Sequence, residues 1–257
     1  MNPTVPGTNR PDLVLLHGWG LGQAAWNAVL PALEARFNVS VLALPGYGST
    51  QPHPFPSFVE TATQITRAIP QDAYVCGWSL GALLALQVAI LAPRRLSGLI
   101  LVSGTASFVQ RDDWPAAQPP ALLDAFCDAV EQDASGALQR FVALFNQGDT
   151  QARAIGRALN RQLQAAPPAD SGTLLDGLGW LRDVDLREKI AAIDTPALII
   201  HGANDTLMPL GAGQWLAENL RGARLTVMPG AAHAPFLNDP EFFANLIGEY
   251  CHAAART

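Results

Sequence analysis

Six short apolar runs recur along the chain, and each is followed by turn-forming residues and a helical pattern. Runs that are apolar at successive positions are typical of strands buried on both faces, as in parallel sheets. Alternation of strand and helix predicts an α/β fold with a mostly parallel central sheet flanked by helices. The six predicted strands are Leu13–Leu16, Val39–Ala43, Tyr74–Cys76, Leu99–Val102, Ala197–Ile200 and Leu225–Met228.

The helical patterns between these runs cover residues 26–36, 59–68, 80–91, 211–220 and 240–252. The alternation stops between about Ser107 and Asp183, where helical patterns cover 124–133, 136–145 and 150–163 without a convincing strand. A chain of 257 residues fits one large domain that carries an insertion. We therefore predict a core made of residues 1–106 and 184–257, with residues 107–183 inserted as a helical cap.

Charge and composition exclude several classes of function. The formal net charge is −6 and the pI is about 5.3, so the chain lacks the basic surface typical of nucleic-acid binding. Its apolar runs are too short for a signal peptide or a membrane span. Three widely spaced cysteines, without a C-x-x-C pair, predict neither a disulfide framework nor a zinc site. We expect a cytoplasmic monomer with reduced thiols, without metal or organic cofactor and without nucleic-acid or membrane partners.

The segment Gly77–Gly81 reads G-x-S-x-G and lies between an apolar strand and an apolar helix. A sharp strand-to-helix turn there forces Ser79 into a strained backbone conformation and exposes its hydroxyl at a helix N-terminus. The glycines allow neighbouring backbone to approach closely. The pattern predicts Ser79 as a nucleophile, and the alternative is a serine in a tight turn without chemistry.

A base and an orienting acid follow in the expected order. His233 lies in the loop after the last predicted strand, and Asp205 follows the strand Ala197–Ile200. Loops at the carboxyl ends of parallel strands form the ligand crevice. The order Ser79, Asp205, His233 is the order expected for a G-x-S-x-G hydrolase, so we predict these three as the catalytic residues. The alternative for Asp205 is an Asx turn or a helix N-cap before Pro209.

Other acids and histidines fit these roles less well. Asp183 and Asp185 lie at the exit of the cap and not after a strand. His53 and His252 have no such placement, and we expect them at the surface. His201 ends a strand and is expected to lie next to the acid loop as a structural neighbour.

The segment His17–Gly20 follows the first predicted strand and reads H-G-x-G. Loops of this kind supply a backbone N–H to an oxyanion. We predict the N–H groups of Trp19 and Leu80 as the two oxyanion donors.

The cap carries an excess of arginine. Arg140, Arg153, Arg157 and Arg161 stand against one acid, Asp149, between residues 136 and 165. The last three arginines are spaced by four and share one helical face. The two interpretations are a solvated face and a docking site for an acidic partner or a phosphate group. The apolar run 141–145 either lines an acyl channel or packs within the cap.

Six segments together resemble the pimeloyl-[acyl-carrier protein] methyl ester esterase family of biotin synthesis, which has the α/β-hydrolase fold. They are Leu13–Leu21, Leu44–Gly48, Gly77–Gly81, Arg140–Leu144, Val184–Arg187 and Ala231–Phe236. The resemblance implies hydrolysis of a methyl ester on a pimeloyl chain held by acyl carrier protein, which is then the expected partner. It implies carrier docking by Arg140, Arg153 and Arg157, with Arg161 compensating for Gly136 where a further arginine is usual. It implies substrate contacts by Trp19, Ser79, Leu80, Phe141, Val142, Ala143, Leu144, Phe145 and His233.

Two alternatives remain beside this reading. A hydrolase of small esters, lactones or C–C bonds would use the same triad. A binding protein on a hydrolase fold would need no chemistry, although such proteins often lose a catalytic residue and none is missing here. A dehalogenase is disfavoured because Ser79 stands where an aspartate nucleophile would be required.

Overall fold

The computed structural model describes residues 10–48, 55–165 and 169–254. All six predicted strands form in one sheet, in the order β2-β1-β3-β4-β5-β6, and every pairing is parallel. The predicted α/β class is confirmed. The strands are β1 Asp12–Leu16, β2 Asn38–Leu42, β3 Ala73–Trp78, β4 Leu96–Val102, β5 Ala197–Gly202 and β6 Arg224–Met228.

The strand order places a crevice at one point of the sheet. Strand β1 pairs with β2 on one side and with β3 on the other, so the chain changes direction across the sheet between β1 and β3. Ligands of open parallel sheets bind outside the carboxyl ends of the strands at such a switch point. The loop after β1 and the turn after β3 meet there, and these are the two segments that carry the H-G-x-G and G-x-S-x-G motifs.

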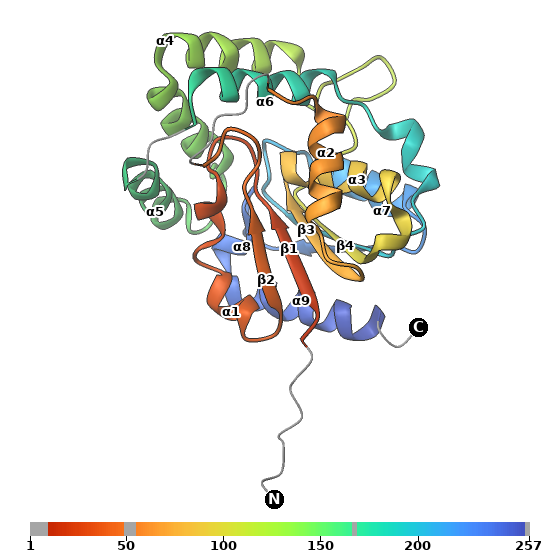
Figure 1. Cartoon of the computed structure of the whole chain (residues 1–257). Coiled ribbons are helices and arrows are strands. Elements are labelled where there is room, and N and C mark those ends of the chain that lie inside the picture. The colour runs from red at the N-terminus through yellow and green to blue at the C-terminus, as the bar shows by residue number, and fades with distance from the viewer. Residues whose placement is uncertain (1–9, 49–54, 166–168, 255–257) are drawn as a thin grey trace, which may run out of the picture.

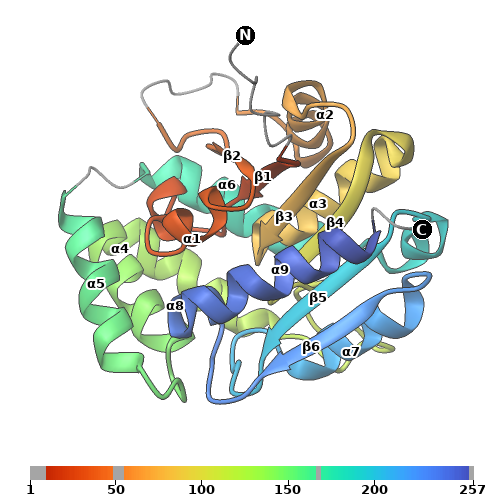
Figure 2. The same cartoon turned by 90° about the horizontal axis from the view of Figure 1, so that it is seen from below.

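Helices cover both faces of the sheet (Figure 2). Helix α3 (Leu80–Leu91) spans the predicted range and is almost wholly buried against β3 and β4. The predicted helix 26–36 is shorter and broken, because Pro31 lacks an N–H and fits only the first turn of α1. The remaining elements of the core are η1 Gln23–Trp26, α1 Leu30–Glu34, α2 Phe58–Ala68, η2 Pro93–Arg95, η3 Arg187–Ala192, α7 Leu210–Asn219, α8 Pro235–Asn238 and α9 Pro240–Ala254.

Three α-helices of the described chain lie between β4 and β5, and we name them the cap helices. They are α4 Pro120–Phe145, α5 Ala152–Ala165 and α6 Ser171–Asp183. The first and third lie over the carboxyl edge of the sheet, and the second lies to one side of it (Figure 1). Helix α4 spans both predicted helices, 124–133 and 136–145. The backbone of Asp133 is not helical, with φ −159° and ψ 90°, and it divides α4 into two parts near the predicted boundary. The N–H of Gly136 donates to Oδ1 of Asp133 at 2.9 Å and so starts the second part. We propose residues 107–183 as the full cap insertion.

Helix α6 was not predicted from the sequence. Its N-terminus is fixed by Asp170, whose Oδ1 accepts the N–H of Thr173 at 2.7 Å. Leu174, Leu178 and Leu181 are buried at helical spacing and hold the helix against α4. The glycines between these leucines obscure the pattern.

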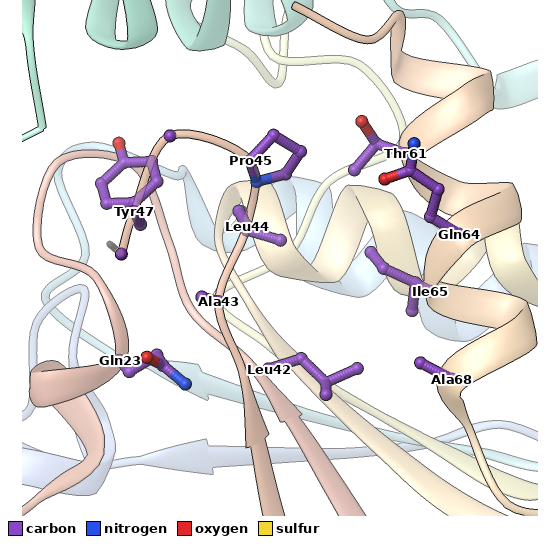
Figure 3. A pocket seen from close by; sticks show the side chains of 12 residues that line it. Gln23, Leu42, Ala43, Leu44, Pro45, Tyr47, Thr61, Gln64, Ile65 and Ala68 are labelled. Atoms are coloured by element: carbon purple, nitrogen blue, oxygen red, sulfur yellow. The ribbon is translucent and has the colours of Figure 1, made fainter. Parts of the chain in front are cut away.

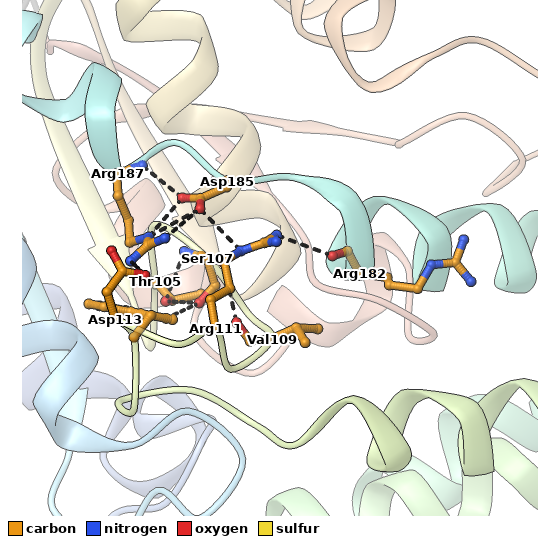
Figure 4. Close-up of polar contacts among 9 residues, drawn as sticks. Thr105, Ser107, Val109, Arg111, Asp113, Arg182, Asp185 and Arg187 are labelled. Atoms are coloured by element: carbon orange, nitrogen blue, oxygen red, sulfur yellow. Dashed lines mark hydrogen bonds and ion pairs between the residues drawn. The ribbon is translucent and has the colours of Figure 1, made fainter.

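The two chain crossings between the core and the cap helices are held together by a polar cluster (Figure 4). Ser107 and Asp185 form an antiparallel bridge, and Nη2 of Arg187 donates to Oδ2 of Asp185 at 2.8 Å. Arg111 forms a second ion pair with Asp185 at 3.1 Å. Burial acts to raise the pKa of Asp185, but the hydrogen bonds and charge of Arg187 outweigh it and hold that pKa below its usual value. Asp185 therefore has a structural role where the chain passes between the core and the cap helices.

Two further expectations concern thiols and membranes. Cys76, Cys127 and Cys251 are all free, as predicted. Among the described residues, no helix has the length and apolar character needed to cross a membrane.

Candidate active site

Ser79 lies in a strained turn between β3 and α3. Its φ is 56° and its ψ is −117°, a conformation that residues with a Cβ rarely adopt. The neighbouring glycines are needed for packing, since a Cβ at Gly77 would collide with the carbonyl oxygen of Gly81, and one at Gly81 with that of Leu16. A Cβ at Gly18 would lie 3.2 Å from the Cβ of Ser79, so the loop after β1 lies directly against the serine.

The predicted base and acid are in contact. Nδ1 of His233 lies 2.8 Å from Oδ2 of Asp205, and neither side chain is exposed to solvent. The other oxygen of Asp205 accepts the N–H groups of Leu207 and Met208 at 3.0 and 2.8 Å. Burial alone would raise the pKa of Asp205, but the His233 ring and these hydrogen bonds hold it below its usual value. The Asx-turn alternative is thus also present, on the oxygen that does not face His233.

The second ring nitrogen of His233 is available as a base. An ionised Asp205 can only accept a hydrogen bond, so Nδ1 of His233 carries the proton and Nε2 has a free lone pair. Nε2 is buried and has no hydrogen-bond partner among the described residues. Nε1 of Trp78 donates to the carbonyl oxygen of His233 at 2.8 Å. Because Trp78 precedes Ser79, this bond ties the histidine loop to the serine turn.

The loop after β1 is fixed by two rings. The N–H of Leu44 donates to Nε2 of His17 at 3.1 Å, so Nδ1 of His17 must be the donor in its 2.8 Å contact with the carbonyl of Gly18. Burial lowers the pKa of His17 to about 4, which keeps the ring neutral. The hydroxyl of Tyr47 accepts the N–H of Gly20 at 2.8 Å. The sequence pattern does not indicate this role of Tyr47, although Leu44–Gly48 is one of the segments that carry the family resemblance.

The two predicted oxyanion donors belong to the loop after β1 and to the start of α3, and both segments adjoin Ser79. Leu80 is the first residue of α3, where the N–H has no acceptor within the helix. The N–H of Trp19 forms no hydrogen bond within the described part of the chain. The indole of Trp19 reaches the cap, because its Nε1 donates to the carbonyl oxygen of Leu174 at 2.8 Å.

A narrow apolar cavity opens onto Ser79 between the core and the cap helices. Its volume is about 10 Å³, so its walls nearly touch, and Ser79 contributes the one hydroxyl among its lining side chains. The lining residues are Trp19, Ser79, Phe108, Leu123, Phe126, Phe141, Leu178, Leu181 and Leu207. Such walls suit an alkyl chain and offer no site for a metal. Among the described residues, no group of three or more His, Cys, Asp or Glu side chains could hold a metal ion.

Comparison with known proteins places this geometry in a family. Residues 13–246 match the model of the alpha/beta hydrolase family. The chain is 41% identical over 244 residues to a pimeloyl-[acyl-carrier protein] methyl ester esterase of Aromatoleum aromaticum, covering 93% of this chain and 97% of that one. It is 37% identical to the enzyme of the same name from Nitrosomonas europaea, covering 92% and 94%. The chain belongs to the alpha/beta hydrolase family, and within it to the family of these two esterases.

A solved structure agrees with the fold of this hydrolase. An esterase from Exiguobacterium antarcticum superposes with a TM-score of 0.86 at 25% identity, covering 94% of this chain and 92% of that one. The resemblance seen in the sequence motifs is therefore confirmed at the level of the family.

The predicted substrate-contact run of this hydrolase divides between two surfaces. Phe141 lines the cavity beside Ser79, and Phe145 packs against the rings of Trp78 and His233 at 5.8 and 5.9 Å. The three residues between them instead border an outer groove of about 660 Å³ between α4 and α5: Val142, Ala143 and Leu144. Their contact with an acyl chain stays a prediction.

The predicted docking arginines lie on the outside of the cap helices. Arg153, Arg157 and Arg161 are exposed on α5, on the side opposite the buried residues Ile155 and Leu159. Arg153 and Arg157 also border the outer groove, and Arg140 is exposed on α4. Within the described ranges, none of these four guanidinium groups forms an ion pair.

Two of the remaining histidines, His201 and His252, lie as expected. Nε2 of His201 contacts the carbonyl oxygen of Met208 at 2.8 Å and lies 3.5 Å from Oδ2 of Asp205, as expected for a neighbour of the acid loop. His252 is exposed on α9. His53 lies outside the described residues.

A second pocket, of about 570 Å³, lies beside the end of β2 and helix α2 (Figure 3). Figure 3 shows Thr61, Gln64 and Ile65 facing it from α2, and Leu44 and Tyr47 from the loop after β2. None of the predicted catalytic or substrate-contact residues lines this pocket.

Proposed function

We propose that this chain hydrolyses the methyl ester of pimeloyl-[acyl-carrier protein], which frees the pimeloyl carboxylate for biotin synthesis. The observation that carries the proposal is the buried contact between His233 and Asp205 next to the strained Ser79. The names of relatives with 37–41% identity over nearly the whole chain support the substrate.

In the proposed reaction, Nε2 of His233 takes the proton of the Ser79 hydroxyl while Oγ attacks the ester carbonyl. The carbonyl oxygen gains negative charge, which the N–H groups of Trp19 and Leu80 stabilise. The bond to the methoxy group breaks as His233 returns the proton to its oxygen, and methanol leaves. Water then attacks the acyl-enzyme with His233 as base, which frees the carboxylic acid and restores Ser79.

The surroundings suit a carrier-bound substrate. The cavity at Ser79 is lined by aromatic and aliphatic side chains, whose apolar surfaces suit a methylene chain once the walls separate to admit it. The unpaired arginines on α5 suit an acidic carrier, because no carboxylate of the described chain neutralises them. We propose Arg140, Arg153, Arg157 and Arg161 as the docking residues.

The direct test measures methanol release from pimeloyl-carrier methyl ester. Wild-type protein should release methanol, should cleave a short p-nitrophenyl ester and should be labelled at Ser79 by a fluorophosphonate. The Ser79→Ala variant should lose all three properties. Undiminished turnover in that variant would reject Ser79 as nucleophile. Cleavage of the p-nitrophenyl ester without methanol release would favour the small-ester hydrolase instead.

The docking proposal has its own test. Arg153→Glu/Arg157→Glu should lower kcat/KM for the carrier-bound ester at least tenfold and leave the free p-nitrophenyl ester unaffected. The matched control is Arg67→Glu/Arg94→Glu, which makes the same change of charge at exposed residues on α2 and η2. Equal losses of kcat/KM in both double variants would show that the effect comes from net charge and not from docking at these arginines.

A further inference from the structure

Asp149 lies in the turn between α4 and α5 and is 8% exposed. It is the one acid between residues 136 and 165, yet its carboxylate pairs with none of the four arginines of that segment. Instead, Oδ2 accepts the N–H of Ala232 at 2.9 Å, and Oδ1 accepts the N–H of Gln151 at 2.7 Å and Nδ2 of Asn238 at 2.8 Å. A buried carboxylate is stable only where such donors surround it. One oxygen of the Asp149 carboxylate is therefore used to bind the segment that directly precedes His233.

The turn that carries Asp149 touches the histidine loop at further points. The N–H of Thr150 donates to the carbonyl oxygen of Gly230 at 2.9 Å. The N–H of His233 donates to the carbonyl oxygen of Phe145, the last residue of α4, at 3.3 Å. Two consecutive N–H groups of the loop, those of Ala232 and His233, thus end on acceptors from the cap helices and their turn.

The same turn also contacts the acid loop. Nδ2 of Asn204 donates to the carbonyl oxygen of Gly148 at 2.8 Å, and its backbone N–H donates to the carbonyl oxygen of Ala231 at 2.9 Å. Asn204 precedes Asp205, as Ala232 precedes His233. One cap turn therefore binds the residue before the acid and the residue before the base.

We propose that Asp149 is a positioning residue for the base, and that its carboxylate holds the Ala231–Ala232 peptide, directly before His233, so that the imidazole stays aligned between Asp205 and Ser79. The inference rests on the proposed role of His233. Within the described residues, the His233 backbone is itself held at its N–H by the Phe145 carbonyl oxygen at 3.3 Å and at its carbonyl oxygen by the indole of Trp78 at 2.8 Å. Removal of Asp149 therefore leaves the long bond to Phe145 as the remaining contact of the Ala232 and His233 N–H groups. A displacement of about 1 Å in a catalytic group can cost on the order of 100-fold in rate.

The test compares Asp149→Ala and Asp149→Asn with wild type on a free p-nitrophenyl ester, which needs no carrier docking. In Asp149→Ala we expect the plateau value of kcat across the pH profile to fall about 10- to 100-fold, with KM changed less than threefold. Asp149→Asn retains one acceptor for the Ala232 N–H and should lose less.

The control is Asp133→Ala, which removes another cap carboxylate that accepts a backbone N–H but is exposed and bonds to Gly136 of its own helix. It should leave kcat unchanged. The inference is overturned by an unchanged plateau in Asp149→Ala, by a shifted pH profile at full plateau rate, or by a loss that only matches the unfolded fraction seen by circular dichroism. If Asp149→Ala does not fold, Asp149→Asn carries the test. Wild-type protein that neither cleaves the ester nor reacts with a fluorophosphonate would instead reject the proposed function.

Discussion

Nδ1 of His17 donates a hydrogen bond to the carbonyl oxygen of Gly18 at 2.8 Å, and this contact fixes the direction of the next N–H. In a trans peptide the carbonyl and the N–H point in opposite directions. Holding the Gly18 oxygen toward the His17 ring therefore turns the N–H of Trp19 away from it. His17 thus orients one of the two proposed oxyanion donors without touching the substrate.

Replacement of His17 by phenylalanine should lower kcat while leaving KM nearly unchanged. The variant keeps a ring against Tyr47 but loses both ring nitrogens. Loss of one oxyanion donor costs on the order of 100- to 1000-fold in kcat, and we expect a value near the lower end because the peptide is displaced and not removed. Steady-state kinetics on the p-nitrophenyl ester measure it. His252→Phe, at an exposed ring on α9, is the control, and a kcat within twofold of wild type in His17→Phe would show that the loop is held without His17.

Stability should fall as pH drops from about 6.5 to about 4, because burial lowers the pKa of His17 to about 4 in the folded chain. In this window the unfolded chain binds a proton that the folded chain does not, so protons favour unfolding. This shift in the pKa of His17 corresponds to about 3 kcal/mol in the free energy of unfolding. That contribution is lost fully only when the pH lies below the pKa of His17 in the folded chain. Burial lowers the pKa of His201 as well, with the same sign.

Urea unfolding at several pH values between 4 and 7 measures this dependence. The slope of unfolding free energy against pH should be smaller in His17→Phe than in wild type. Parallel curves for the two proteins would contradict the assignment of the slope to His17.

Replacement of Arg187 by lysine should destabilise the junction between the core and the cap helices. Arg187 makes a two-pronged contact with Asp185, pairs with Asp113 at 3.0 Å and lies over the Trp114 ring at 5.4 Å. Lysine keeps the charge but provides neither the planar fork nor the stacking, so we expect a loss of about 1–2 kcal/mol in urea unfolding. Arg182→Lys, in a pair with both side chains more than half exposed, should lose close to nothing. Equal losses in both variants would mean that the planar contacts of Arg187 add no stability.

The sequence was sufficient for the parts of the site that depend on local patterns. Ser79 was predictable because its motif lies between two strongly apolar elements, and α3 begins and ends at the predicted residues. The contact between Asp205 and His233 was predictable from their places after strands. The role of Asp149 was not, because its contact with Ala232 joins residues 83 positions apart and no local pattern encodes it. The indole of Trp78 reaches across 155 positions to His233 for the same reason.

The strain at Ser79 gives the last prediction, which concerns stability and not rate. The positive φ of 56° is disfavoured for any residue with a Cβ, and such strain costs on the order of 1–3 kcal/mol. Ser79→Ala keeps the Cβ and the strain, whereas Ser79→Gly relieves it at a cost of about 0.5–1 kcal/mol in chain entropy. Both variants should be inactive, and Ser79→Gly should be more stable than Ser79→Ala by about 1 kcal/mol in urea unfolding.

The opposite order is expected where the backbone is unstrained. Thr63 lies in the middle of α2, and there glycine should be less stable than alanine by about 1 kcal/mol. If alanine were the more stable residue at both positions, the turn at Ser79 would store no strain. If glycine is favoured only at 79, part of the chain's stability is given up to hold the serine hydroxyl at the start of α3, in the wall of the apolar cavity where the proposed nucleophile has to lie.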